Sequence, residues 1–410
     1  MKLRNKFIIL SAIAVMLTGC SEKTADDLPE DTPWNNGVNA VMETENGYYT
    51  NISRQLNLRY AEKGSDIEIF LCARPECSHN GNESCTATYN KLETTNTVLY
   101  DGSLYFVSTD NSDETVGYYF YKAASDGTAL DKIGDVFTVQ NSSDAECNFG
   151  NMPFVIHKGF AYIPYYIAIG EGTVNTYAGS GIVKMNIENG EKEQLITGNG
   201  YFDYAPEIIG GCGDYVYYNL ISSHSDWNGS YRYNITDGSI EALLFRVYPY
   251  KERLFSLGFV SEDNATIDKW SILEYDVDTL EPKGEVVSLD ENLFGIISQE
   301  IAIYNDMFFG YGENRVDIYG FDGNKLGSID IPKAEDKYRE TDFKISDGRL
   351  YMIRRLDLIT VDEEGNYIGN LFDVYSCEIS EITSGTGTWQ ETYGIKNAGN
   401  VFERKEVIFK

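Results

Sequence analysis

The sequence predicts an all-β fold, because short antiparallel hairpins recur along it while helical periodicity is nearly absent. The clearest hairpin runs from Val98 to Val107, where a short apolar run, the turn Asp101-Gly102 and an aromatic strand follow one another. Asp-Gly and Asn-Gly pairs favour such hairpins because they adopt positive φ at low cost.

This hairpin occurs seven times along the chain. The other copies run Val41–Tyr49, Val155–Tyr162, Ile208–Tyr217, Val247–Phe255, Ile301–Phe308 and Phe343–Tyr351. A second hairpin follows each copy, so that every unit has four strands. These second hairpins run Leu58–Leu71, Tyr118–Leu130, Gly181–Ile196, Tyr231–Leu244, Ile272–Val287, Val316–Ile331 and Leu358–Phe372.

Four-stranded units with a period of roughly 40 to 60 residues predict a β-propeller, whose blades bury their faces against their neighbours. We expect seven blades of four antiparallel strands over residues 38–372, with six or eight blades as the alternatives. Residues 373–410 hold two further expected strands, 393–396 and 401–409. This tail either completes the first blade and closes the ring, or begins an eighth blade. Residues 38–410 are then a single domain.

The first residues have the pattern of an export signal. Three bases, Lys2, Arg4 and Lys6, precede an apolar run from Phe7 to Leu17 that is too short to span a bilayer. The run ends in Leu17-Thr18-Gly19-Cys20, which resembles the lipobox of bacterial lipoproteins. An ordinary secretory signal with a chance cysteine is the alternative, and both interpretations predict export.

The resemblance to the lipobox implies three segments in the chain. Residues 1–19 are a signal peptide, Cys20 becomes the lipidated N-terminus, and residues 20–37 form a tether. The expected location is the outer face of a bacterial cell membrane, and the membrane is a partner through the lipid alone.

Charge excludes one class of partner. The chain carries 64 acidic and 33 basic residues, a net charge of −31. Removal of residues 1–19 takes away three bases and no acid, which leaves a net charge of −34. We expect no nucleic-acid partner, because phosphate neutralisation requires a stripe of Lys and Arg.

Three thiols and an imidazole lie within 14 residues, at Cys72, Cys77, His79 and Cys85. Pro75 ends the preceding strand, so we place the group in the loop between the first two blades. Three cysteines and one histidine suit a tetrahedral, structural Zn²⁺. Disulfide bonding is the alternative, because six cysteines follow Cys20 and export usually means oxidation.

The lipobox, this cysteine block with Ala87, and the repeated Asp-Gly-x-Leu-Tyr hairpins together resemble a known group of proteins. They are similar to uncharacterised β-propeller lipoproteins of Gram-positive, gut-type anaerobic bacteria, a domain-of-unknown-function group related to low-density-lipoprotein-receptor-type propellers. The resemblance implies a cell-surface propeller without an established activity, and an anaerobic source favours metal over disulfide. The receptor-type Tyr-Trp-Thr-Asp signature is missing, which argues against a receptor-like ligand.

The lengths of the connections indicate where a ligand binds. The first and third connections of each unit are tight turns, whereas the second connections and the links between units are longer. In propellers the longer connections emerge on one face, which we take as the binding face, together with the cysteine block. Its expected loops are Gln140–Pro153, Ala168–Gly179, Gly198–Ala205 and Ser222–Gly229. The candidate ligand residues in these loops are Tyr177, Tyr201, Tyr204, His224, Asp226 and Trp227.

Two functions fit these observations. The first is a non-catalytic binding or scaffold module for a glycan, a peptide or a partner protein, since flat rings stack while short polar groups fix hydroxyls and amides. The second is a secreted carbohydrate hydrolase or lyase that uses carboxylates at the channel mouth. Acids such as Asp203, Glu207 and Asp214 do not stand out from the other acids, so we assign no catalytic residue. We favour the binding module.

Overall fold

The structure is a computed structural model of the chain. The chain divides into two compact units, Met1–Glu30 and Asp31–Lys410. All described residues lie in the second unit. The structure describes residues 41–396 except for 44–45, 51–57, 63–67, 79–84, 88–93, 112–114, 141–145, 150–152, 172–173, 200–203, 223–228, 261–268, 290–300, 313, 335–337, 347, 357–359, 362–366 and 369.

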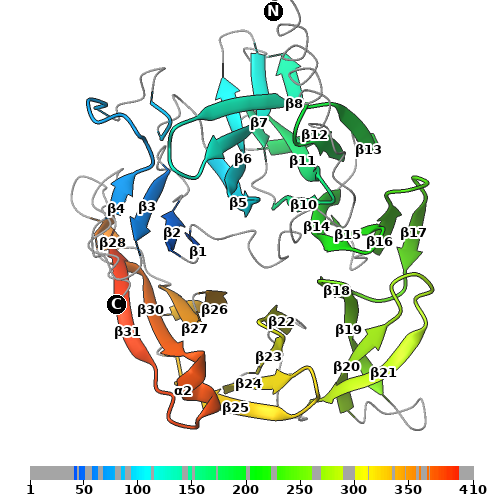
Figure 1. The fold of residues 1–410 in the computed structure, drawn as a ribbon, viewed down its shortest axis with the longest axis vertical. Helices are drawn as coiled ribbons and strands as arrows, with labels where there is room; N and C mark the ends of the chain where they lie inside the picture. The colour runs from blue at the N-terminus through cyan, green and yellow to red at the C-terminus, as the bar shows by residue number, and fades with distance from the viewer. Residues whose placement is uncertain are drawn as a thin grey trace, which may run out of the picture. The chain divides into compact units, whose positions relative to one another are not determined.

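The described residues form seven sheets that each contain a four-stranded antiparallel path, and these are the blades of a β-propeller. Figure 1 shows them in chain order, with the first strand of each blade on the inner side and the fourth on the outer side. The first blade has β1 (Val41–Glu43), β2 (Gly47–Thr50), β3 (Arg59–Glu62) and β4 (Glu68–Phe70). The second has β5 (Thr94–Tyr100), β6 (Ser103–Asn111), β7 (Thr115–Ala124) and β8 (Leu130–Gln140).

The next three blades repeat this order. The third has β10 (Val155–His157), β11 (Phe160–Glu171), β12 (Val174–Asn186) and β13 (Lys192–Asn199), and β9 (Glu146–Phe149) pairs with β11 as a fifth strand. The fourth has β14 (Tyr204–Cys212), β15 (Tyr215–Ser222), β16 (Gly229–Asn234) and β17 (Ile240–Leu243). The fifth has β18 (Val247–Tyr250), β19 (Arg253–Val260), β20 (Lys269–Tyr275) and β21 (Pro282–Ser288).

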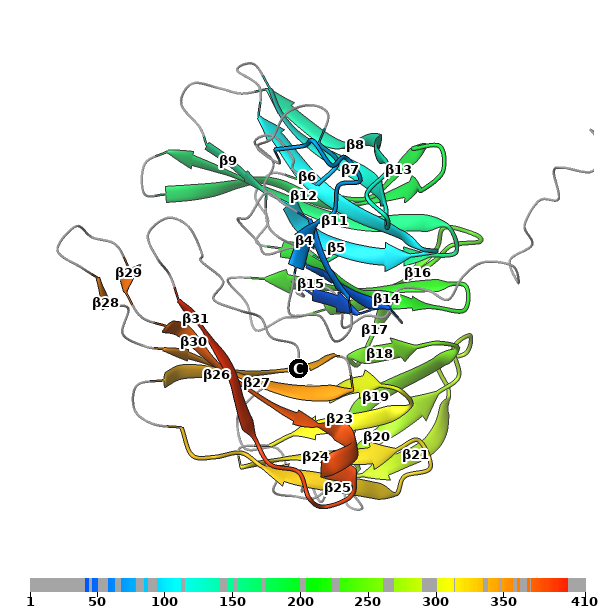
Figure 2. The same ribbon diagram turned by 60° about the vertical axis from the view of Figure 1, so that its left-hand side comes forward.

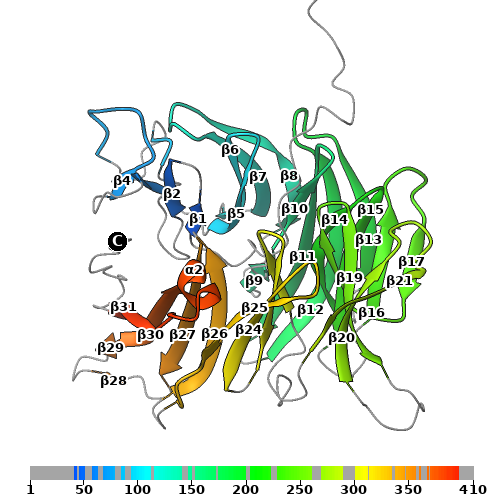
Figure 3. The same ribbon diagram turned by 60° about the horizontal axis from the view of Figure 1, so that its bottom comes forward.

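The sixth blade has β22 (Ile301–Tyr304), β23 (Met307–Tyr311), β24 (Arg315–Gly320) and β25 (Lys325–Asp330). The seventh has β26 (Tyr338–Ser346), β27 (Arg349–Leu356), β30 (Asn370–Glu378) and β31 (Gln390–Lys396). A two-stranded sheet of β28 (Thr360–Val361) and β29 (Tyr367–Ile368) lies between β27 and β30 in the chain, and Figure 2 shows it beyond the ends of these strands. The short helix α2 (Ile379–Thr383) connects β30 to β31 (Figure 3). Within the described residues no helix is long and apolar enough to cross a membrane.

All seven predicted first hairpins are confirmed by the strand pairing. The turn between β5 and β6 shows why the sequence signal was sufficient, because Asp101 and Gly102 both have positive φ, at 46° and 67°. A two-residue turn with two positive φ values matches the twist of the flanking strands, and an Asp-Gly pair adopts it cheaply.

The core consists of six apolar clusters in the described residues, and each joins two consecutive blades. Aromatic rings fill these interfaces, as where Phe120 of β7 meets Phe154 at the start of the third blade edge to face, with centroids 5.4 Å apart. The repeated aromatic strands therefore pack blade against blade, as propeller blades must.

The seventh blade and the tail differ from our expectation. We expect residues 358–372 to supply the third and fourth strands, but Thr360–Val361 and Tyr367–Ile368 form the separate two-stranded sheet of β28 and β29. Tail residues instead provide most of β30 and all of β31, which pair with β27 and with each other. The described part of the tail, up to Lys396, therefore belongs to the seventh blade. β28 and β29 pair only with each other in the described residues, and β30 pairs along β27 in their place. The expected strand 401–409 lies outside the described residues.

Candidate metal centre between the first and second blades

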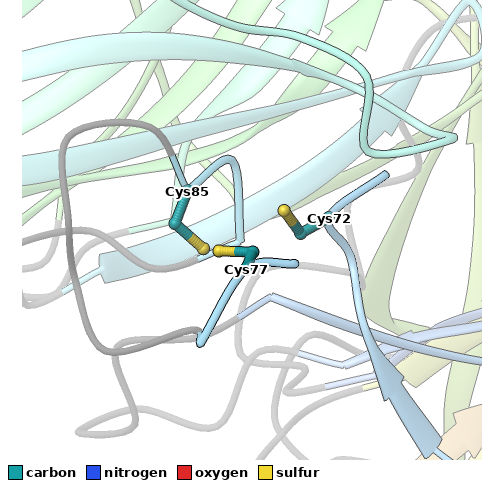
Figure 4. A group of neighbouring side chains, drawn as sticks. All are labelled: Cys72, Cys77 and Cys85. Atoms are coloured by element: carbon teal, nitrogen blue, oxygen red, sulfur yellow. The ribbon is translucent and has the colours of Figure 1, made fainter. Parts of the chain in front are cut away.

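The three cysteines of the predicted metal site meet after the first blade. Cys72 and Cys77 follow β4, and Cys85 lies further along the connection to β5. Their three Sγ atoms all lie within 4.8 Å of one another. Figure 4 shows the sulfur atoms of Cys77 and Cys85 pointing at each other, with Cys72 beside them. Cys85 is buried, and the other two are half-buried.

A tight turn brings the first two thiols together. The backbone N–H of Cys77 donates to the carbonyl oxygen of Arg74 at 3.1 Å, which closes a four-residue turn with Pro75 in its second position. Proline favours that position because its fixed φ matches the turn. The expectation that Pro75 ends the strand is wrong, because β4 already ends at Phe70. Pro75 instead lies in the turn that brings Cys77 back toward Cys72.

The second blade supports the cysteine connection from one side. The backbone N–H of Ala73 donates to the carbonyl oxygen of Gly127 at 3.1 Å, and the Thr86 hydroxyl donates to the same oxygen at 2.7 Å. Gly127 lies in the tight turn between β7 and β8. The cysteine block was expected beside the long connections. Instead it packs against a tight turn of the next blade, because the chain after β4 runs across that turn.

The electrostatics favour a thiolate at Cys72. Burial opposes its ionisation, but hydrogen bonds from Thr86, from the backbone N–H of Arg74 and from Cys77 outweigh burial. The pKa of Cys72 falls as a result from 9.0 to about 7. A thiolate is the form in which cysteine binds metal ions and attacks disulfides.

The donor set fits a metal ion of borderline or soft character. Tetrahedral Zn²⁺ with Zn–S bonds of about 2.3 Å places its sulfur ligands about 3.8 Å apart, which small side-chain rotations bring within reach here. A disulfide, by contrast, joins only two of the three sulfur atoms. Cys77 and Cys85 face each other for such a bond (Figure 4), and Cys72 then stays a thiol.

The other predicted site residues separate into two groups. Cys20, His79, Tyr201, His224, Asp226 and Trp227 lie outside the described residues, as does Asp203. Tyr177 lies in β12 and Tyr204 in β14. The expected loop Ala168–Gly179 is therefore wrong, because β11 and β12 continue as a paired hairpin to Glu171 and Val174. The loop predicted around Cys147 contains β9, which pairs with β11.

Two of the acids weighed as catalytic candidates have structural partners. Glu207 accepts a hydrogen bond from the Asn219 amide at 3.1 Å. The Asn219 amide oxygen in turn accepts one from the Ser230 hydroxyl at 2.7 Å. Asp214 forms an ion pair of 2.6 Å with Lys158, and this lysine lowers the pKa of its carboxyl.

Sequence reasoning missed Gly127 and Thr86 as parts of the site. Thr86 stands next to Cys85, which was a usable signal. Gly127 gave no signal of its own, because the Asp-Gly turn that contains it recurs in other blades and only the fold brings this copy to the cysteines.

A comparison with protein-family models gives no match. A comparison with curated proteins gives none either. Among solved structures, the chain is similar to a prolyl endopeptidase, with a TM-score of 0.50 and 11% identity over 93% of this chain and 53% of that one. This chain thus spans about half the length of that endopeptidase.

Two further solved structures are similar at lower scores. One is an oligogalacturonate lyase in complex with manganese, with a TM-score of 0.44 and 9% identity over 75% of this chain and 81% of that one. The other is the WD40 domain of SCAP from fission yeast, with a TM-score of 0.36 and 10% identity over 90% of this chain and 88% of that one. The similarity to the endopeptidase supports the propeller fold and nothing more specific.

Proposed function

We propose that this chain is an exported, lipid-anchored β-propeller that binds a glycan, a peptide or a partner protein and does not catalyse a reaction. The observation that carries the non-catalytic part concerns its carboxyl groups. Among the described residues, every carboxyl with a resolved change has a pKa below its usual value, and these groups are Asp126, Asp214, Asp237, Asp276 and Asp322.

The cause of these low values is structural. At Asp126, Asp237, Asp276 and Asp322 the largest contribution is a hydrogen bond from a residue two or three positions later in the same turn. A general acid for glycoside cleavage needs the opposite, a carboxyl whose pKa is raised toward neutral pH. These turn aspartates support hairpins and are poorly suited to give a proton to a leaving group.

The proposed ligand face comprises the second connections of the blades and the links between blades, with Tyr177, Tyr201, Tyr204, His224, Asp226 and Trp227 as its candidate contacts. Glycan and peptide arrays with the mature protein test this proposal. We expect a bound ligand class whose affinity falls about tenfold or more when Trp227→Ala removes a stacking ring. Leu244→Ala, at a fully exposed leucine after β17, is the matched surface control. Equal binding by both variants removes Trp227 from the site.

A carbohydrate hydrolase or lyase is the alternative function. Incubation of the mature protein with neutral and acidic polysaccharides, followed by detection of new chain ends, separates the two proposals. Sustained product formation that rises with protein concentration contradicts the non-catalytic proposal.

We propose that Cys20 carries the lipid that holds the protein at the outer face of the membrane. The support is its position at the end of the lipobox-like Leu17-Thr18-Gly19-Cys20. Metabolic labelling with a palmitate analogue tests the anchor. We expect Cys20→Ser to lose the label and to leave the membrane fraction, whereas a variant that keeps both contradicts the proposal.

We propose a structural Zn²⁺ on Cys72, Cys77 and Cys85, with His79 as the fourth ligand from the sequence. The convergence of three Sγ atoms within 4.8 Å supports it. Elemental analysis with thiol counting tests it, and we expect about one zinc ion per chain. Blocked thiols with less than about half an equivalent of metal favour the disulfide instead.

A further inference from the structure

We propose that a metal ion on Cys72, Cys77 and Cys85 clasps the first blade to the second, so that metal binding and the docking of these two blades are linked equilibria. This proposal rests on the proposed metal site. It adds that a turn in the second blade, which contains no ligand, sets the metal affinity.

One apolar cluster joins the first blade to the second, with Tyr49 of β2 packed in the same cluster as Leu104 of β6. The apolar area that the two blades bury against each other stabilises both of them. Cys85 belongs to the apolar cluster that joins the two blades, and Cys72 and Cys77 pack against that cluster.

One backbone oxygen of the second blade positions two of the three thiols. The carbonyl of Gly127 accepts the N–H of Ala73, the neighbour of Cys72, and the hydroxyl of Thr86, the neighbour of Cys85. The Tyr49 hydroxyl of β2 donates to the carbonyl of Ser125 in the same turn at 3.0 Å. When the first blade separates from this turn, Ala73 and Thr86 lose their hydrogen bonds to the Gly127 carbonyl oxygen. The neighbouring thiols of Cys72 and Cys85 are then no longer held close together.

Gly127 also lies too close to the cysteine connection for any side chain. Its φ is +73°, and a Cβ atom there would lie 2.7 Å from the carbonyl carbon of Leu71 and 2.8 Å from the nitrogen of Cys72. These are backbone atoms, so no side-chain rotation relieves the contact, and the backbone at Leu71 and Cys72 must move. Gly238, in the corresponding turn of the fourth blade, has a φ of +74° and nothing within 4 Å of such a Cβ atom.

These two glycines give a matched experiment. Gly127→Ala and Gly238→Ala carry the same backbone strain, but only the first displaces Cys72. The mature protein and both variants are purified under reducing, oxygen-free conditions and titrated with Co²⁺ and then Zn²⁺. We expect Gly238→Ala to bind metal like the unchanged protein and Gly127→Ala to bind about 10 to 100 times more weakly, the usual effect of losing support around metal ligands.

A second measurement needs no variant, so it tests the link between metal binding and blade docking even if Gly127→Ala does not fold. Hydrogen exchange is compared with and without Zn²⁺. We expect removal of the metal to speed exchange in peptides from β1–β4 and to leave peptides from β18–β25 unchanged. Equal affinity of a folded Gly127→Ala variant, unchanged exchange in the first blade, or a Cys77–Cys85 disulfide without metal binding each overturns the clasp. The array experiments on the ligand face do not depend on these results, so the two proposals fail separately.

Discussion

The surroundings of Cys72 and Cys377 change the pKa values of their thiols in opposite directions. Hydrogen bonds lower the pKa of Cys72 to about 7. Burial raises the pKa of Cys377 above its usual 9.0, and the nearby Glu381 carboxylate adds to that rise. Cys72 follows β4 and Cys377 lies near the end of β30, and the sequence alone does not distinguish the two thiols. What distinguishes them is the set of donors and charges that the fold places around each sulfur.

We expect this difference to appear in the pH dependence of alkylation. In the reduced, metal-free protein, iodoacetamide should modify Cys72 with a midpoint near pH 7, while Cys377 should require a pH above about 9. Because the folded pKa of Cys72 lies below its unfolded value, the stability from its thiolate is present above about pH 9 and is lost as the pH falls through about 7. Mass spectrometry of labelled peptides checks the prediction, and identical pH profiles for the two thiols would contradict it.

The blades are joined by polar contacts as well as by apolar clusters. Arg232 of β16 is the clearest example, since it donates to the carbonyl oxygens of Val277 at 2.6 Å and Asp278 at 3.0 Å in the next blade. Its guanidinium also lies over the Tyr215 ring and pairs with Glu241 at 2.6 Å. The arginine is buried, whereas the glutamate is half-exposed. Most of the stabilisation should therefore come from the contacts to the neighbouring turn.

We predict unequal costs when either partner of this pair is changed. Arg232→Met should lower the free energy of unfolding by about 2–4 kcal/mol, because two carbonyl groups of the next blade lose the buried guanidinium that donates to them. Glu241→Gln should cost less than about 1 kcal/mol, because the Glu241 carboxylate is half-exposed and an amide oxygen in its place still accepts the hydrogen bond from Arg232. Urea denaturation of both variants measures the difference. Equal losses of unfolding free energy in the two variants would show that Arg232 stabilises the fold through its ion pair with Glu241 and not through its contact with the next blade.

The β28–β29 hairpin is an addition to the seventh blade. It pairs with no other strand among the described residues. The ladder between β27 and β30 is complete without it, since the register runs from Arg349↔Glu378 to Arg355↔Phe372. The hairpin is therefore an insertion in the second connection of a finished blade.

Replacement of residues 357–370 by Asn-Gly should leave the fold intact. The new two-residue turn suits the twist of β27 and β30, so that we expect a change of less than about 1 kcal/mol in the free energy of unfolding. Far-UV circular dichroism and urea denaturation check this. Aggregation, or a loss above about 2 kcal/mol, would mean that the insertion supports the blade.

At the scale of the whole molecule, net charge opposes compactness. The chain carries a net charge of −31, which repels itself in the folded state. We expect the Tm to rise by several degrees between about 0.02 and 0.5 M NaCl, because salt screens exposed charges beyond about 10 Å at 0.1 M. Differential scanning calorimetry with NaCl and KCl checks the prediction. A falling Tm in both salts would show that the favourable ion pairs outweigh the repulsion.

The connectivity of the blades also belongs to this scale. Each of the seven sheets takes its four main strands from one continuous stretch of chain, and none combines strands from both ends of the described residues. The tail extends the seventh blade as far as it is described, because β30 and β31 supply the third and fourth strands and β28–β29 is an insertion before them. The tail's second expected strand, 401–409, lies outside the described residues.

The sequence by itself determined the local structure: seven hairpins whose turns accept positive φ, and aromatic strands that need a neighbouring blade. These properties depend on residues close together in the chain, so a reader of the sequence can find them. Only the tertiary structure decided that three cysteines converge, that Gly127 of another blade holds them, and that β30 and β31 finish the seventh blade. Those outcomes depend on contacts between residues that are distant in the chain, such as the hydrogen bond from Thr86 to Gly127. A local sequence pattern does not indicate which of these contacts form or how much each one stabilises the fold.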